Sequence, residues 1–319
     1  MAMFRGAVFN EFVKLKGRLM VLVCLFTAML IGLVILQETA RPENTPTPSD
    51  WTVPHLETLE RIKMASLEAK GEERVLLERK AHFMELQLQA QTNPEAGGAI
   101  HWVSMELHGG FLRYALPLLM LFLGSDLFSK EFASKTIKSP LLSPIGRTKL
   151  AIGKWTALWL MAQFFLFIYI AVVFGIGLAD GGWNEGASSQ VIVYGANQSA
   201  VIPIHLFILI ALAGQMIVTA ACASIILLVS YLLRHSVSMS VVISVAVLFV
   251  AEFMLSGYSN RIPLLSMFPT RHFAFLDHLT ADWKHASGSF FESLLILTAT
   301  YAVCLTLLLV LFRKQDVHA

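Results

Sequence analysis

The run from Leu19 to Leu36 contains eighteen residues without one charged side chain. An α-helix rises about 1.5 Å per residue, so this run nearly spans a hydrocarbon core of about 30 Å. Five further long apolar stretches follow it along the chain: Gly110–Leu127, Trp155–Leu178, Ile204–Leu233, Ser236–Gly257 and Phe290–Phe312. The sequence therefore predicts an all-α polytopic membrane protein with six transmembrane helices.

The composition excludes an ordinary soluble protein. Hydrophobic residues make up 56% of the chain and charged residues only 14%, against about a quarter charged in soluble domains. The formal net charge of +2 favours neither nucleic acid nor a polyanionic substrate. The three cysteines, Cys24, Cys222 and Cys304, each fall inside an apolar stretch, which predicts small core side chains with no disulfide or metal framework.

Lys and Arg are distributed unevenly between the segments that connect the predicted spans. One set of segments holds thirteen of them, and the opposite set holds four when the long first loop is left out. Long loops cross the membrane largely regardless of their charge, and short cytoplasmic loops carry the excess of Lys and Arg. Both termini are therefore predicted to be cytoplasmic.

The N-terminal segment, residues 1–18, has the pattern of an amphipathic helix. Phe4, Val8 and Phe12 share one helical face, and the opposite face carries Glu11, Lys14 and Arg18. This pattern predicts a cytoplasmic helix in the membrane plane, directly before the first span at residues 19–36.

The first loop, residues 37–109, is predicted to be extracytoplasmic and helical. The stretch from His55 to Gln91 is rich in Glu, Lys, Leu and Ala at helical spacing, and Gly71 is expected to divide it into a hairpin. The loop could form a lid or a partner-binding surface. The alternative, a helical pair that packs on itself or on a second copy, is favoured because such pairing is common.

Residues 110–319 form the remaining five-span membrane domain.

The polar segment between the second and third spans, residues 128–147, is the most informative. Phe128, Phe132 and either Thr136 or Ile137 fall on one face of a predicted helix from Phe128 to Lys138, and Ser139-Pro140 should end that helix. Taken alone, the pattern fits either a charged connector at the membrane surface or a shaped docking element.

This segment resembles type 2 ABC transporter permeases, the membrane subunits of ABC exporters. The matching residues are Asp126, Phe128, Glu131, Thr136, Lys138, Leu141, Pro144, Arg147, Gly153 and Lys154. Lys135 departs from the pattern, since the family often has Gly there. The amphipathic N-terminal segment and the six-span layout also fit this family.

The resemblance implies a bacterial plasma-membrane subunit that forms the translocation pathway as a dimer, with a second permease copy or a homologous permease. It also implies two copies of a separate P-loop ATPase. The residues expected to receive the ATPase movement are Phe128, Glu131, Phe132, Lys135, Thr136, Lys138, Leu141, Pro144 and Arg147.

Gly153-Lys154 resembles the end of a nucleotide-binding loop, but the surrounding residues do not fit one. A Walker A loop needs G-x-x-x-x-G-K-[ST], but Gly153-Lys154 is followed by Trp155 and has Thr148 at the first glycine position. ATP and Mg²⁺ are therefore expected in the partner ATPase, with no cofactor and no enzyme activity in this chain.

Three polar side chains fall inside the predicted spans and are candidates for the pathway: Gln163, Gln215 and Glu252. Ionisable groups within a span are costly and often functional. Glu252 could instead stay hydrated or pair with Arg261 or Arg271. The two glutamines are more readily explained as interhelical hydrogen-bond partners. An ATP-independent channel or secondary transporter that uses Glu252, and a membrane scaffold or sensor that uses the first loop, remain alternative functions.

The last connecting segment, Tyr258–Ser289, is unusually apolar for a water-facing loop and is expected to return to the membrane surface. It also contains His272, Asp277, His278, Asp282 and His285. Their spacing matches no common ligand motif, so no metal site is predicted there.

Overall fold

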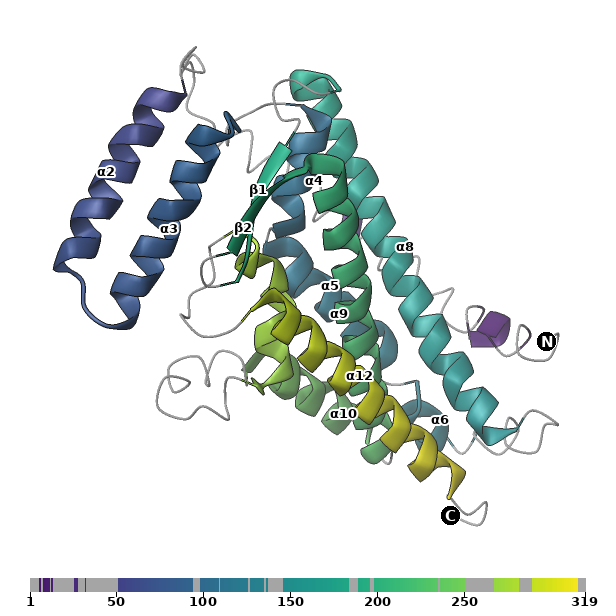
Figure 1. Ribbon diagram of the computed structural model, residues 1–319. Coiled ribbons are helices and arrows are strands. Elements are labelled where there is room, and N and C mark those ends of the chain that lie inside the picture. The colour runs from purple at the N-terminus through teal and green to yellow at the C-terminus, as the bar shows by residue number, and fades with distance from the viewer. Residues whose placement is uncertain are drawn as a thin grey trace.

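The computed structural model describes residues 6, 8–11, 13, 26–27, 32, 51–93, 98–108, 110–125, 127–134, 136, 146–183, 189–195, 198–234, 236–250, 267–280 and 289–314. Most of them are helical (Figure 1). The elements in chain order are α2 (Thr52–Glu68), α3 (Glu72–Gln89), α4 (Ala99–His108), α5 (Gly110–Gly124), α6 (Ser129–Ala133), α8 (Arg147–Gly181), β1 (Ser189–Gly195), β2 (Gln198–Pro203), α9 (Ile204–Leu232), α10 (Val237–Val245), η1 (Ala246–Val250), η3 (Pro269–His278) and α12 (Phe290–Arg313).

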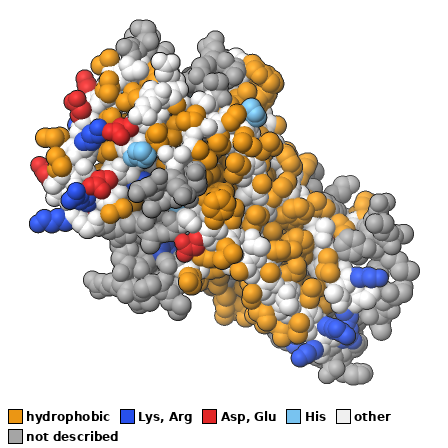
Figure 2. Space-filling view, in the orientation of Figure 1, with side chains coloured by type: hydrophobic (Ala, Val, Ile, Leu, Met, Phe, Trp, Pro, Cys, Tyr) orange, Lys and Arg blue, Asp and Glu red, His pale blue; other side chains and the backbone are white. Residues whose placement is uncertain are grey.

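Four helical segments are long and apolar enough to cross a membrane: Leu112–Ala133, Arg147–Ala179, Ile204–Leu232 and Phe290–Arg313. They coincide with the second, third, fourth and sixth predicted spans. A shorter apolar helix, Val237–Val250, covers the start of the fifth and ends in the π-helical turn η1. Figure 2 shows a band of hydrophobic side chains between two more charged ends of the molecule. The chain is a multi-pass membrane protein.

Most of the first predicted span lies outside the described residues, so the count of six spans stays a prediction. Phe26, which belongs to that span, is buried, and its ring lies 5.2 Å from the ring of Phe165 on α8. This residue of the first apolar stretch therefore packs against the third.

Helix α9 lies at the centre of the bundle and contacts α4, α5, α8, α10 and α12. Its buried face includes a run of small residues, Ala220–Ser224, which allows neighbouring backbones to approach closely. At Gly214 the approach is closest. A Cβ added there would lie 2.2 Å from Cε2 of Phe275, so η3 is packed directly against this glycine.

A further helix, α4, precedes the second predicted span. Helix α4 precedes α5 and packs along α8, and Ala99 N donates to Gly182 O at 2.9 Å. The close packing extends to Gly177, where a Cβ would lie 2.6 Å from Cα of Ala99. His101 and Glu106 lower the average hydropathy of α4, which explains why the apolar window began only at residue 110.

The helical hairpin expected in the first loop consists of α2 and α3. Gly71 joins them at φ +62°, a conformation that glycine adopts at little cost. Leu59, Ala81 and Met84 are buried between the two helices. The pair therefore packs on itself, as one of the two readings of this loop predicted. We call the end of the bundle that carries it the hairpin end.

The β-hairpin of β1 and β2 was not predicted from the sequence. The strands are antiparallel, with Val191 opposite Val201 and a bulge between Val193 and Gly195. Val191 and Val193 are buried against Phe83 of α3, and Val193 N donates to Leu279 O at 2.9 Å. The β-hairpin thus joins the helical hairpin to the segment that follows η3.

The described part of the last connecting segment, η3, is buried in the protein. All but two of its ten residues are buried, and its backbone leaves the helical region at Ala274. His272 Nδ1 and His278 Nε2 each lie 2.8 Å from Ser293 Oγ of α12. Non-helical backbone at this depth is tolerated because the surrounding helices cover it.

Candidate functional site

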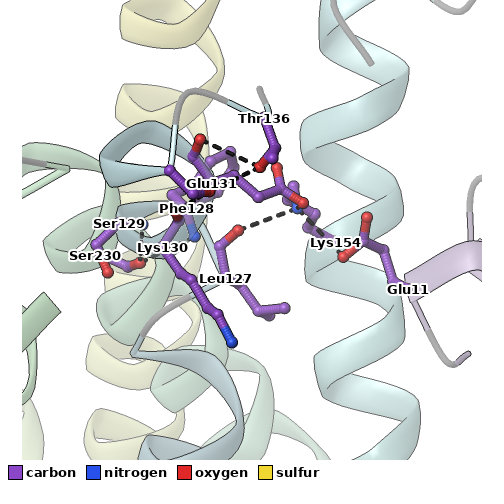
Figure 3. Close-up of polar contacts among 10 residues, drawn as sticks. Glu11, Leu127, Phe128, Ser129, Lys130, Glu131, Thr136, Lys154 and Ser230 are labelled. Atoms are coloured by element: carbon purple, nitrogen blue, oxygen red, sulfur yellow. Dashed lines mark hydrogen bonds and ion pairs between the residues drawn. The ribbon is translucent and has the colours of Figure 1, made fainter. Parts of the chain in front are cut away.

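The most completely buried charge in the described residues is Lys154, at the end of the bundle opposite the hairpin. It lies in the third turn of α8, and its side chain is 0% exposed. Its Nζ lies 2.9 Å from Glu131 Oε1, 3.2 Å from Glu11 Oε2 and 3.1 Å from Leu127 O (Figure 3). We call Lys154, Glu11 and Glu131 the lysine cluster.

The lysine cluster satisfies the donors of Lys154 completely. An ammonium group has three N–H donors, and the three acceptors account for one each. The ammonium also lies 5.3 Å from the centre of the Phe128 ring, within the range of a cation–π contact. Taking these charges out of water is costly, and the three contacts at the ammonium offset part of that cost.

The corner between α5 and α6 places Glu131 toward Lys154. Phe128 N and Ser129 N both donate to Ser230 Oγ of α9, at 3.2 and 3.3 Å. Ser240 Oγ of α10 donates to Ser125 O at 2.5 Å. Two hydroxyls from other helices therefore satisfy backbone groups where α5 ends, and they fix the start of α6.

Aromatic side chains hold the same corner from the side of α9 and α12. Phe128 is 0% exposed, and its ring lies 5.8 Å from Tyr231 and 5.3 Å from Phe312. Phe132 packs at 6.2 Å from Tyr231, and the Arg234 guanidinium lies over the Phe132 ring at 5.4 Å. The short helix α6 is thus packed into the bundle through its aromatic face.

Three separate segments meet at the single ammonium group. Glu11 comes from the helical residues 8–11 near the N-terminus, Glu131 comes from α6, and Lys154 comes from α8. Buried electrostatic contacts are stronger than the same contacts in water. The contacts of Lys154 therefore connect α6, α8 and the N-terminal helical residues through one buried charge.

The comparison with known proteins identifies this architecture. The family of ABC-2 family transporter proteins matches residues 9–317 of the chain. The chain belongs to this family. It is also 28% identical, over 202 residues, to the bacitracin transport permease protein of Bacillus licheniformis. That match covers 61% of this chain and 82% of the relative.

The resemblance to ABC permeases is therefore confirmed, and the lysine cluster lies in the membrane subunit of an ABC transporter. Of the residues predicted to couple this ABC-2 protein to an ATPase, the structure brings Phe128, Glu131 and Phe132 together in α6 and its N-cap. Their coupling role stays a prediction.

The helix predicted from Phe128 to Lys138 is shorter in this ABC-2 protein. Helix α6 ends at Ala133. Ser134 Oγ donates to Lys130 O at 2.7 Å, and Thr136 Oγ1 donates to Glu131 O at 3.4 Å. The Ser134 hydroxyl shares Lys130 O with the backbone N–H of Ser134, so both hydroxyls bond to carbonyls of the last turn where the helix ends.

The remaining predicted coupling residues are more scattered. Arg147 begins α8, and its Nη1 donates to Arg313 O at the end of α12, at 3.4 Å. Lys135, Lys138, Leu141 and Pro144 lie outside the described residues, as does the pathway candidate Glu252.

Gln163 of the ABC-2 protein is the interhelical partner that was expected. Its Nε2 donates to Thr219 Oγ1 at 2.7 Å, between α8 and α9. Trp155 and Trp159 make similar contacts to Ser224 Oγ and Met216 O, at 3.0 and 3.2 Å. Gln215 differs, because it lines a cavity between α5, α9 and η3.

Sequence reasoning missed the central role of Lys154 and Glu11. Lys154 was counted among the cytoplasmic charges and matched to the family motif, and Glu11 was placed on a polar helix face. One signal was present, since Gly153-Lys154 stands directly before an uninterrupted apolar stretch. A lysine there either reaches the membrane surface or is paired, and only tertiary packing decides between the two.

Proposed function

We propose that the chain is the permease subunit of an ATP-driven ABC exporter. It forms the translocation pathway as a dimer and is moved by a separate P-loop ATPase that docks on residues 128–147. The single observation that supports coupling at this place is the lysine cluster. It joins α6, α8 and the N-terminal helical residues through one buried ammonium group.

The charge distribution supports an orientation with the lysine cluster on the cytoplasmic side. The segments predicted to be cytoplasmic hold thirteen Lys and Arg residues, and those on the other side hold four. Lys130, Arg147 and Arg313, all at the end opposite the hairpin, belong to the richer set. The hairpin of α2 and α3 is then extracytoplasmic, in the plasma membrane of a bacterium.

The proposed cargo is an amphipathic molecule. The relative in Bacillus licheniformis is named for bacitracin transport. The described spans are largely apolar, and the buried polar side chains among the described residues are mostly Ser and Thr. Such a pathway suits a molecule with a large hydrophobic part.

The first experiment tests whether an ATPase partner exists. The tagged protein is purified in mild detergent from its native host, and the chains that co-purify are identified by mass spectrometry. We expect a stoichiometric P-loop ATPase and ATP hydrolysis by the preparation. A lone protein without ATPase activity, under conditions that preserve other membrane complexes, would favour the channel, carrier or scaffold functions.

The second experiment tests coupling at the lysine cluster. Glu131→Gln keeps the size of the side chain and removes its charge. We expect export to fall while the ATPase still co-purifies, because the contact that passes movement to α8 is weakened. Arg147→Gln is expected to uncouple as well. Lys314→Gln is the matched control, since Lys314 is an exposed charge at the end of α12 and lies outside residues 128–147. Normal export by both test variants would refute the proposal.

A further inference from the structure

Helix α6 begins without a capping side chain of its own. Its N-cap residue is Phe128, whose side chain has no hydrogen-bonding atom. The first amides of a helix have no partner within the helix, so they need an acceptor from elsewhere. Ser230 of α9 supplies it, because its Oγ accepts from both Phe128 N and Ser129 N (Figure 3). The start of α6 is therefore capped by a neighbouring helix.

This capping contact is shielded from water. Ser129 and Ser230 are both completely buried. A buried N–H group that loses its acceptor costs more than an ordinary hydrogen bond contributes, so the two amides strongly favour keeping Ser230 in place. Helix α9 ends two residues later, at Leu232. The contact thus connects the start of α6 to the last turn of α9.

The next residue of α9, Tyr231, contacts both α6 and α12. On the side of α6, its ring lies 5.8 Å from the Phe128 ring and 6.2 Å from the Phe132 ring. On the side of α12, it lies 5.7 Å from the Phe312 ring, and its hydroxyl donates to Leu311 O at 3.1 Å. All three ring pairs are edge-to-face, a geometry that stabilises aromatic contacts beyond the area they bury. Tyr231 therefore joins α6 to the last turn of α12.

Arg234 fixes the direction of the Tyr231 hydroxyl. Its Nη1 donates to the tyrosine oxygen at 3.2 Å, and its guanidinium lies 5.4 Å from the centre of the Tyr231 ring. A hydroxyl that accepts one hydrogen bond still has its own proton to donate. That proton goes to Leu311 O, so the polar contact with α12 has a defined geometry.

Helix α12 is placed to respond to a movement of α9. It packs more extensively on α9 than on any other element, and it ends at the same end of the bundle as α6 (Figure 1). Most of its apolar span faces away from the rest of the described chain, and Leu307 and Val310 are among its exposed side chains. A displacement of α12 into the surrounding lipid would therefore uncover little of the core.

We propose that Ser230 and Tyr231 are positioning residues that pass the movement of α6 to α12. When the ATPase displaces α6, the end of α9 follows through Ser230, and Tyr231 carries α12 with it. This route is separate from the lysine cluster, which joins α6 to α8, so the distance between the adjacent ends of α8 and α12 changes. The inference rests on the proposed function, because the ATPase supplies the movement.

The test measures that distance in the complex with the ATPase that co-purifies. Spin labels are attached through Lys149→Cys on α8 and Lys314→Cys on α12, after Cys24, Cys222 and Cys304 have been replaced by alanine. Double electron–electron resonance compares the complex without nucleotide and the complex trapped with ATP and vanadate. ATPase co-purification and ATP hydrolysis are measured on the same samples.

Two variants interrupt the route at different places. Ser230→Ala removes the acceptor of two amides, so the population of the displaced α12 conformation should fall about tenfold or more. Tyr231→Phe keeps the ring and removes only the hydroxyl, so that population should fall about fivefold. Matched controls are Ser238→Ala, exposed on α10, and Tyr301→Phe, which keeps the ring that packs on Trp155. Where Ser230→Ala does not fold, Tyr231→Phe decides.

The outcomes separate this inference from the proposed function. Absence of a co-purifying ATPase refutes both. The inference alone is overturned if the ATPase is bound and active but the wild-type distance does not change with ATP and vanadate. It is also overturned if Tyr231→Phe shows the full change, or if the controls lose as much as the test variants. A purely structural role would lower the yield of folded complex and leave the distance change intact.

Discussion

On the helical hairpin, Arg74 Nε lies 2.7 Å from Glu78 Oε1, and both side chains are about half exposed. At the opposite end of the bundle, Lys154 Nζ lies 2.9 Å from Glu131 Oε1, and the lysine is fully buried. The distances are nearly equal, but water screens the first pair and not the second. Burial, and not distance, therefore decides which of the two pairs the fold depends on.

Removing the buried ammonium should have the largest effect. Lys154→Met leaves Glu11 and Glu131 facing each other without a cation, and breaking a buried pair in this way costs about 3–5 kcal/mol. We expect a strong loss of thermal stability in detergent. Lys149→Met, on the exposed side of the first turns of α8, is the control. Equal stability of the two variants would show that the lysine cluster is dispensable.

Removing one carboxylate should have an intermediate effect. Glu131→Gln and Glu11→Gln each replace one carboxylate by a neutral amide and leave the ammonium paired with the other carboxylate. We expect each to cost about 1–3 kcal/mol. Glu11→Gln should also expose the N-terminal segment to a protease, since Glu11 ties that segment to α8. A double-mutant cycle with Lys154→Met measures the coupling, and independent, additive effects would contradict a shared cluster.

Ionic strength should distinguish the exposed charges of the hairpin from the buried lysine cluster, with a smaller effect on stability than the substitutions above. Raising ionic strength from about 0.1 to 1 M shortens the screening length from about 10 to 3 Å, which acts on exposed charges far more than on buried ones. The stability difference between Lys154→Met and the wild type should therefore hardly change with salt. A difference that disappears at high salt would mean that water reaches the lysine cluster.

The exposed hairpin pair should give the smallest effect. Glu78→Gln is expected to cost less than about 0.5 kcal/mol, as exposed helix pairs usually do. Thermal unfolding at low salt is the measurement. A loss comparable to that of Glu131→Gln would remove the contrast between the two ends.

Local patterns in the sequence were enough to predict much of the fold. The third, fourth and sixth spans coincide with α8, α9 and α12 because an apolar run of that length has few alternatives to a helix in lipid. The hairpin at Gly71 was also predictable, since helical spacing on both sides of one glycine is a local signal.

The features that were missed depend on contacts between distant segments. The burial of Lys154 requires Glu11 and Glu131, which are far away in the chain. Strand β1 is stabilised by Phe83 of α3 and by the carbonyl of Leu279. The cavity at Gln215 forms only where η3 packs against α5 and α9. Neither the local hydropathy nor the helical spacing of side chains reports contacts between segments that are distant in the chain.

The attachment of the hairpin has a consequence for protein engineering. Arg79 of α3 donates to the carbonyl of His278 in η3 at 3.3 Å, and β1 forms a second link to Leu279. Deleting α2 and α3 would therefore uncover buried backbone, so a truncated variant makes a poor starting point for crystallography. The turn at Gly71 has open space around it, and a reporter peptide or antibody epitope inserted there would project from the protein without disturbing its core.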